Sequence, residues 1–210
     1  MAIDFRLTSH QRELQLESRK FAADALANAR AAELLPTPEE RFRATKPIYE
    51  AMVAAGFLRK CIPASAGGDN TGLIDMAIMA EEFYSVNASV TLTMLGTVLG
   101  LLPILLGGTP EQVGRLLNPF LKKSGAPLAA FCATEPSGSA NAASPLPGEG
   151  VRTVAELKGD KWIINGRKKW ISSATGWDAS QNCCCPRSPL NPISQIVDSC
   201  LNRVSNDEPK

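Results

Sequence analysis

The residues of this chain that could do chemistry gather between positions 128 and 173. Two of them, Thr134 and Ser172, carry hydroxyl groups that can donate a hydrogen bond to a ligand. Trp170 offers a broad apolar ring that can lie against a flat ligand and keep water away from it. Glu135 has the chemistry of a general base, but we expect it to make structural contacts in a loop.

Short strands joined by turns must position these residues. Apolar runs at 128–133, 151–157 and 162–164 predict three strands. The Asn-Gly dipeptide at 165–166 supplies positive φ angles, so we expect it to close a hairpin. A loop rich in Ser, Gly, Ala and Pro connects the first two predicted strands.

Two patches in this stretch resemble the motifs of a known family. Residues 131–136, Phe-Cys-Ala-Thr-Glu-Pro, resemble the Thr-Glu-Pro motif of the acyl-CoA dehydrogenase family. Residues 159–172 resemble its second motif, a hairpin followed by Lys-x-Trp-Ile and Ser or Thr. A Thr-Glu-Pro triplet alone occurs by chance in many proteins, whereas two longer patches in the family's order and separation are specific. The resemblance implies an FAD-dependent oxidoreductase with a helical N-terminal domain, a middle β-domain and a helical C-terminal domain.

The resemblance also implies which residues meet the cofactor. An isoalloxazine needs hydrogen bonds along its pyrimidine edge, a donor near N5 and an apolar wall. The first motif would meet the flavin edge, Trp170 would lie against the rings and Ser172 would offer its hydroxyl near N5. Taken singly, such residues are more often ordinary parts of a strand, and it is the joint match that favours binding. The predicted cofactor-binding residues are Phe131, Ala133, Thr134, Ser139, Ala140, Trp170 and Ser172.

The sequence after the Thr-Glu-Pro triplet departs from the family's usual x-Ala-Gly-Ser-Asp. Here it is Ser-Gly-Ser-Ala-Asn at 137–141, so Ala140 and Asn141 replace a Ser and an Asp that help to hold pyrophosphate or acyl-CoA. The nitroalkane oxidase branch of the family tolerates this change. The chain resembles that branch over most of residues 3–178, in particular at 3–5, 41–47, 81–83, 135–141 and 176–178.

The resemblance to this branch implies a particular chemistry. A proton would leave the carbon beside a nitro group, the carbanion would attack flavin N5, and oxygen would reoxidise the flavin, giving aldehyde and nitrite. In dehydrogenase relatives the reaction would instead be α-proton abstraction from an acyl thioester, with hydride transfer from the β-carbon to N5. The substrate is therefore expected to be a small molecule, a nitroalkane or an acyl-CoA.

A set of helices precedes the predicted strands. Thr-Pro-Glu-Glu at 37–40 and Thr-Pro-Glu-Gln at 109–112 predict helix starts, each with an N-cap residue and Pro at the first helical position. A capping box is predicted at 8–11, and Gly56 is expected to end a helix over 48–55.

Residues 83–110 contain no charged side chain. They could span a membrane, but polar residues and Pro interrupt the apolar run, so we favour a helix buried in the core.

The sequence thus predicts an α+β protein in three parts. These are an all-α N-terminal domain at 1–124, a partial antiparallel β-domain at 125–178 and an irregular tail at 179–210. Members of the family are longer, and their final helical domain carries the catalytic base. We therefore assign no catalytic residue and expect weak or no turnover from this chain alone. The alternative is a non-catalytic interaction or oligomerisation module that keeps the fold without the cofactor.

Composition argues against several other classes of function. The 22 basic and 21 acidic residues give a net charge of +1, which would not draw in nucleic acid or an anionic membrane. The single histidine, His10, is expected to be solvated and leaves no material for a histidine-rich metal site. Three of the six cysteines are consecutive, unlike a disulfide framework, and the N-terminus lacks an apolar signal core. We expect a cytoplasmic flavoprotein without nucleic-acid, membrane or metal partners, and a homo-oligomer in the full-length family.

Overall fold

The computed structural model describes residues 6–138, 141, 144, 146, 149–174, 176 and 177. Helices come first and a two-stranded antiparallel hairpin follows, which confirms the predicted α+β class. The α-helices are α1 (Ser9–Asp24), α2 (Arg30–Glu33), α3 (Pro38–Ala44), α4 (Lys46–Ala54), α5 (Leu73–Tyr84), α6 (Ala88–Gly107) and α7 (Pro110–Leu121). Short 3₁₀ turns are η1 (Leu26–Ala29), η2 (Arg59–Cys61) and η3 (Ala64–Ala66). The strands are β1 (Val154–Lys158) and β2 (Lys161–Asn165).

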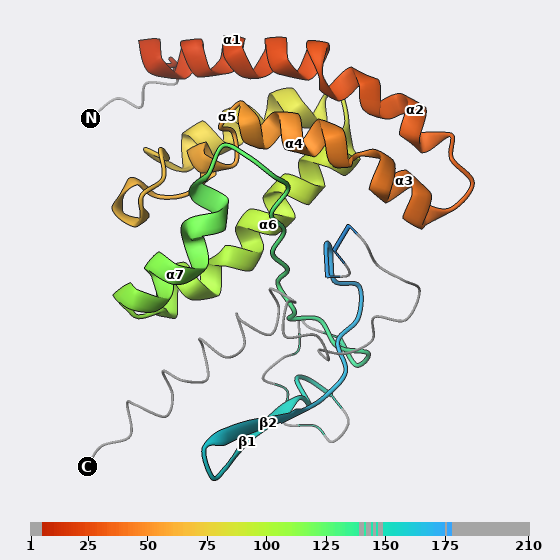
Figure 1. Cartoon of the computed structure of the whole chain (residues 1–210), viewed down its shortest axis with the longest axis vertical. Helices are drawn as coiled ribbons and strands as arrows, with labels where there is room; N and C mark the ends of the chain where they lie inside the picture. The colour runs from red at the N-terminus through yellow and green to blue at the C-terminus, as the bar shows by residue number, and fades with distance from the viewer. Residues whose placement is uncertain are drawn as a thin grey trace.

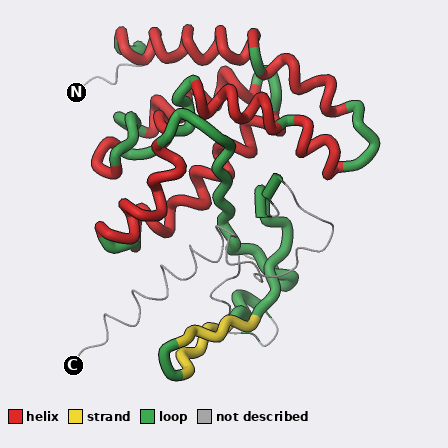
Figure 2. The backbone as a smooth tube through the Cα atoms, viewed as in Figure 1, coloured by secondary structure: helices red, strands yellow, loops and turns green. Residues whose placement is uncertain are grey.

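The helices and the hairpin occupy opposite ends of the molecule. In Figure 1, α1 lies along one edge of the helical bundle, α6 crosses the bundle and the hairpin projects away at the far end. In Figure 2, the described residues between α7 and the hairpin are all drawn as loop. The boundary expected at 124/125 falls within this connection and stays a prediction. We call the two ends the helical part (residues 6–121) and the β part (residues 126–177).

Three helices begin as their sequences predict. Thr8, Thr37 and Thr109 each accept a hydrogen bond from the backbone N–H three residues later, and Gln or Glu at that position bonds back to the threonine N–H. These reciprocal bonds satisfy amides that a helix start would otherwise leave unpaired. Gly56 follows α4 with φ +86°, the left-handed conformation that commonly ends a helix at glycine. The predicted capping box at 8–11, the two predicted helix starts with Pro and the helix end are therefore confirmed, and the structure adds a capping box at each of the two Pro-containing starts.

The apolar core of the helical part forms around α6. Val90, Met94 and Leu101 of this helix are fully buried, together with Tyr49 of α4 and Phe83 of α5. By length and composition α6 could cross a membrane, but half of its most apolar window is buried inside the protein. The predicted core helix is thus confirmed as part of the buried cluster.

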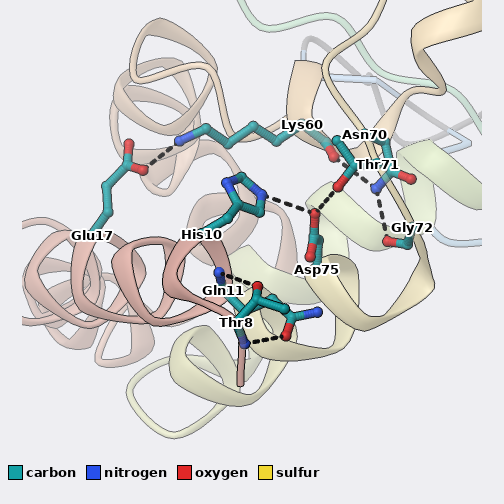
Figure 3. Close-up of polar contacts among 9 residues, drawn as sticks. All are labelled: Thr8, His10, Gln11, Glu17, Lys60, Asn70, Thr71, Gly72 and Asp75. Carbon is teal, nitrogen blue, oxygen red and sulfur yellow. Dashed lines mark hydrogen bonds and ion pairs between the residues drawn. The ribbon is translucent and has the colours of Figure 1, made fainter. Parts of the chain in front are cut away.

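Polar contacts fix α1 against the start of α5 and the turn before it. Figure 3 shows His10 of α1 facing Asp75 of α5, with His10 Nε2 3.2 Å from Asp75 Oδ2. Thr71 donates its hydroxyl to the same carboxylate oxygen. His10 is largely exposed, as predicted, but it also has this partner on α5. It therefore has a structural role in joining two helices.

The hairpin turn does not lie where the sequence predicted it. Strands β1 and β2 pair antiparallel with Lys158 opposite Lys161, so Gly159 and Asp160 form the turn. Gly159 has φ +66°, which suits a two-residue loop with glycine first. The prediction that Asn-Gly at 165–166 closes the hairpin was wrong, because Asn165 is the last residue of β2 and pairs with Val154.

Two predicted strands also differ from the structure. Residues 128–133 run without pairing in a sheet, and β1 begins three residues later than the predicted strand at 151–157. The apolar run at 128–133 is explained instead by packing, since Leu128, Ala129 and Ala130 are buried. An apolar run of this length marks burial, but it does not by itself require a sheet neighbour.

Candidate functional site

The segment that leads into the first motif crosses the middle of α6. A Cβ atom at Gly100 would lie 2.5 Å from the backbone nitrogen of Ala130, so only glycine lets the chain cross the helix this closely. The Tyr49 hydroxyl donates a 2.8 Å hydrogen bond to the Pro127 carbonyl just before the crossing. Burial raises the pKa of Tyr49, so its hydroxyl keeps the proton that it donates. Phe131 follows the buried residues and is 43% exposed.

The second motif lies directly beside the first. The Lys169 N–H donates a 2.9 Å hydrogen bond to the Thr134 carbonyl. The Lys168 ammonium donates to the Ala133 carbonyl at 3.2 Å. These contacts join segments that are more than 30 residues apart and bring Trp170 next to the first motif. The two motifs therefore lie side by side in the structure.

Glu135 connects these segments through a buried carboxylate. Its side chain accepts hydrogen bonds from the Arg152 N–H (2.7 Å), the Thr153 N–H (3.1 Å), the Thr153 hydroxyl (2.6 Å) and the Lys168 ammonium (2.7 Å). The bonds from Lys168 and Thr153 hold the pKa of Glu135 down at about 2. The predicted structural role of Glu135 is confirmed, and a carboxylate bonded in this way is a poor proton acceptor.

The basic run at 167–169 predicts a solvated strand segment, and for Lys168 this prediction was wrong. The residue follows β2 in a segment without strand pairing, and its side chain is only 26% exposed because it reaches inward to Glu135. Its neighbours Arg167 and Lys169 are exposed, as predicted. A run of three basic residues gave no signal of which one pairs with a buried carboxylate.

Trp170 projects from the second motif into solvent. It is 75% exposed and has φ +60°, a conformation that bulky side chains rarely adopt. The Lys169 ammonium lies 4.3 Å from the centre of its ring, a cation–π distance. Such an exposed aromatic in a strained backbone is typical of a binding position.

Ser172 lies against the same helix as the first motif. A Cβ atom at Gly96 would be 3.6 Å from Ser172 Cβ, so the serine is beside α6 at this level. Gly96 is one helical turn from Gly100, where the segment before the first motif crosses. The hydroxyls of Ser172 and Thr134 make no hydrogen bond within the part of the chain that the structure describes.

The structure thus brings Phe131, Ala133, Thr134, Trp170 and Ser172 together on two adjoining segments, with Ser172 beside α6. Ser139 and Ala140 lie outside the described residues. Glycines 96 and 100 were missed, because no sequence pattern distinguishes a glycine at a crossing point from any other glycine in a helix. Trp177 was also missed as an anchor, although it belongs to a segment that resembles the family.

Trp177 anchors the far end of the β part to the helical part. Its indole stacks on Phe42 at 4.5 Å with the rings 11° apart, and it lies 5.5 Å from the Tyr49 ring. The indole N–H donates a 2.8 Å hydrogen bond to the Ala126 carbonyl. Tyr49 and Trp177 therefore hold the start and the end of the β part against the same helices.

A separate cleft of about 220 Å³ lies between α2, α3 and the start of α6. None of the described cofactor-binding candidates lines it. Two charged side chains at this cleft have internal partners: Glu33 accepts from the Asn87 amide, and Arg41 donates to the Leu35 carbonyl. We therefore assign no ligand to this cleft.

The described part of the chain contains no cluster of three or more His, Cys, Asp or Glu side chains suited to a metal ion. Two cysteines in that part are free thiols. Burial raises the pKa of Cys61 to about 12, and burial also raises the pKa of Cys132. Neither thiol is poised as a nucleophile, because the reactive thiolate is disfavoured.

Comparison with known proteins agrees with this arrangement. The family "Acyl-CoA dehydrogenase, N-terminal domain" matches residues 8–124. Nitroalkane oxidase from Podospora anserina is 42% identical over 180 residues, which cover 85% of this chain and 41% of that protein. Nitroalkane oxidase from Fusarium oxysporum is 34% identical over 178 residues, covering 84% of this chain and 40% of that protein.

Solved structures show the same likeness. The structure of Podospora anserina nitroalkane oxidase has a TM-score of 0.78 and 39% identity, covering 91% of this chain and 47% of that one. An acyl-CoA dehydrogenase from Bacillus anthracis in complex with FAD has a TM-score of 0.64 at 25% identity, covering 80% of this chain and 27% of that one. The chain thus spans less than half the length of these relatives. It belongs to the acyl-CoA dehydrogenase family.

Proposed function

We propose that this chain binds FAD and forms one wall of the active site of a nitroalkane oxidase-like oxidoreductase. The observation that carries the proposal is the hydrogen bond from the Lys169 N–H to the Thr134 carbonyl. It joins the two motifs and leaves the exposed ring of Trp170 beside the polar edge of the first motif. Both nitroalkane oxidase relatives match the chain over this region.

The residues present fit a flavin. The hydroxyls of Thr134 and Ser172, which have no hydrogen-bond partner among the described residues, can donate to the polar edge of an isoalloxazine, and the exposed Trp170 ring can cover part of its face. Phe131 adds a second exposed aromatic side chain. When bound, FAD would supply the electron acceptor that no protein side chain provides. This chain would bind it, orient it and exclude water from one side.

The outer face of α6 favours an apolar substrate at this site. Leu92 and Leu99 are exposed on either side of Gly96, the position that lies beside Ser172. Residues 84–110 carry no charge, so this face suits an alkyl chain rather than a phosphate. Together with Ala140 and Asn141 in place of the family's Ser and Asp, this supports a nitroalkane. An acyl-CoA thioester is the alternative.

Glu135 would not take the substrate proton, because its hydrogen bonds favour the ionised form so strongly. The proton acceptor of a complete enzyme would then come from outside the described residues. We therefore expect little turnover from this chain by itself. We also propose an intracellular location, in keeping with the free thiols Cys61 and Cys132, and homo-oligomers for complete members.

A titration of the purified chain with FAD tests the proposal. We expect flavin absorbance to stay with the protein after desalting, and Trp170→Ala to weaken FAD binding about tenfold through lost ring contact. Tyr84→Ala is the matched control, since it removes an exposed aromatic from α5 outside both motifs. Absence of FAD binding by the unmodified chain, or equal losses in the two variants, would exclude this function.

A second function is favoured by one observation on α6. Leu92, Leu95, Leu99, Leu102 and Leu106 recur at alternating spacings of three and four residues, as in the seam of a coiled coil. All five are at least partly exposed. This leucine seam, uncharged along its length, could pair with the same seam of a second copy. The chain would then act as an association module without a cofactor.

The two functions separate in one pair of measurements. An association module would sediment as a dimer that Leu99→Lys dissociates, while Leu16→Lys, at an exposed leucine of α1, would leave it intact. The association module would also not bind FAD. A chain that remains monomeric at all concentrations and binds FAD would exclude the association module.

A further inference from the structure

Three segments of the β part meet at one carboxylate. Glu135 belongs to the first motif, Thr153 precedes β1, and Lys168 follows β2. Glu135 is 2% exposed, and both of its side-chain oxygens accept hydrogen bonds from the other two segments. Lys168 also reaches past Glu135 to the Ala133 carbonyl of the first motif. A single ion pair therefore lies at the junction of all the segments that carry the candidate site.

We propose that Glu135 and Lys168 are positioning residues for the cofactor: their buried ion pair sets the spacing between the two motifs and thereby the affinity for FAD. The inference rests on the proposed function, because it names what holds that same site in shape. Neither residue need touch the cofactor. We call this ion pair the Glu135–Lys168 clasp.

The hydrogen-bond pattern requires a charged carboxylate at position 135. One oxygen accepts from the Arg152 N–H, and the other accepts from both Thr153 donors and from Lys168. A glutamine would have to turn its own N–H₂ group toward one of these donor sets. Either orientation leaves a buried donor facing another donor, which is costly where water has little access.

The position of Lys168 makes the clasp a spacer as well as a bond. Its ammonium lies between the Glu135 carboxylate at 2.7 Å and the Ala133 carbonyl at 3.2 Å. The next residue, Lys169, bonds the Thr134 carbonyl, and Trp170 comes directly after it. A shift of Lys168 would therefore move Trp170 relative to Thr134.

The chain also offers an ion pair without this role. Lys158 and Glu156 lie 3.3 Å apart on β1, with side chains 66% and 54% exposed. Surface pairs of this kind contribute little. They make a matched control, because the change of residue type is the same and only the position differs.

The test is FAD affinity of the full chain at a temperature well below the melting of each variant. We expect Glu135→Gln and Lys168→Met each to weaken FAD binding about tenfold or more, because each leaves a buried partner unpaired. The double variant should bind no worse than Glu135→Gln, since the two residues act as one unit. Lys168→Arg, which keeps the charge, should restore most of the affinity. Glu156→Gln and Lys158→Met should leave it unchanged.

Amide hydrogen exchange tests the clasp without any cofactor. In Glu135→Gln the Lys169 and Thr153 amides should exchange faster, while amides paired within β1 and β2 keep their rates. If the unmodified chain takes up no FAD, the proposed function fails. The exchange rates would still show whether the clasp holds the two motifs together. Unchanged exchange and unchanged affinity in Glu135→Gln, or additive losses in the double variant, would overturn the inference. Should Glu135→Gln not fold, Lys168→Met and Lys168→Arg decide it by the same two measurements.

Discussion

The helical part and the β part are held together by different kinds of interaction. The helical part encloses a core in which Phe83, Met94 and Leu101 are fully buried. The hairpin buries almost nothing, since Ile163 and Ile164 are about as exposed as typical surface residues. Apart from the buried residues 128–130 at its start, the β part depends on the Glu135–Lys168 clasp and on Trp177. Burial therefore stabilises one part, whereas a few polar contacts and one anchor shape the other, and a ligand can add most to the second.

The largest effect is expected from a substitution that leaves a cavity in the core of the helical part. Phe83→Ala removes a ring that packs edge-on against Phe57 at 4.9 Å, and we expect it to lower the free energy of unfolding by about 4 kcal/mol. Urea unfolding followed by far-ultraviolet circular dichroism measures this loss. Tyr84→Ala, at the neighbouring exposed position, should change the stability by less than about 1 kcal/mol. Equal losses would mean that the core is not where the structure puts it.

Removing the anchor should separate the two parts. Trp177→Ala deletes the stack on Phe42 and the hydrogen bond to the Ala126 carbonyl, a loss of about 3 kcal/mol in the docking of the β part. Limited proteolysis should then cut between residues 126 and 177 much faster, while the helical part keeps its melting temperature. Trp177→Phe keeps an aromatic ring and should show a smaller change. A matching fall in helical stability would contradict the division into two differently held parts.

Acid should loosen the β part before the helical part. The pKa of Glu135 is lowered from its ordinary value of 4.5 to about 2, so its contribution to stability is present above pH 4.5 and is lost as the pH falls toward 2. The protection of the Thr153 amide, measured against its intrinsic exchange rate at each pH, should therefore fall across this range. In Glu135→Gln this fall should be absent, because no carboxylate titrates there. Parallel pH profiles in the two proteins would count against this account.

The smallest expected effect is at the hairpin turn. Gly159→Ala places a side chain at φ +66°, which should weaken β1–β2 pairing by about 1 kcal/mol and leave the helical part unchanged. Amide exchange across the hairpin measures the change. Gly166→Ala should cost more, because its Cβ would lie 2.1 Å from the Thr153 hydroxyl oxygen. A larger loss from Gly159→Ala than from Gly166→Ala would contradict this order of effects.

Local signals in the sequence were sufficient for much of the helical part. The helix starts at Thr8, Thr37 and Thr109 follow from side chains three residues apart, and Gly56 ends α4 through its own backbone freedom. The burial of α6 follows from its lack of charge. Each of these features depends on neighbours in the chain, which a sequence displays directly.

The β part was harder to predict, because its decisive contacts join distant residues. Gly-Asp and Asn-Gly both favour a turn, and strand pairing rather than composition decides between them. Resemblance placed the two motifs together correctly, but nothing singled out Lys168 from its two basic neighbours. The stacking of Trp177 on Phe42 spans 135 positions and left no periodic signal. The cofactor roles of the seven candidate residues remain predictions.

The contrasting settings of two tryptophans make the molecule its own optical reporter. Trp177 is 8% exposed between two aromatic rings, whereas Trp170 is 75% exposed, so the first should emit at shorter wavelengths than the second. Release of the anchor would shift the emission to the red, and a ligand that covers the outer ring would shift it to the blue. Fluorescence could thus follow domain docking and ligand capture separately, in one cuvette and without any added dye.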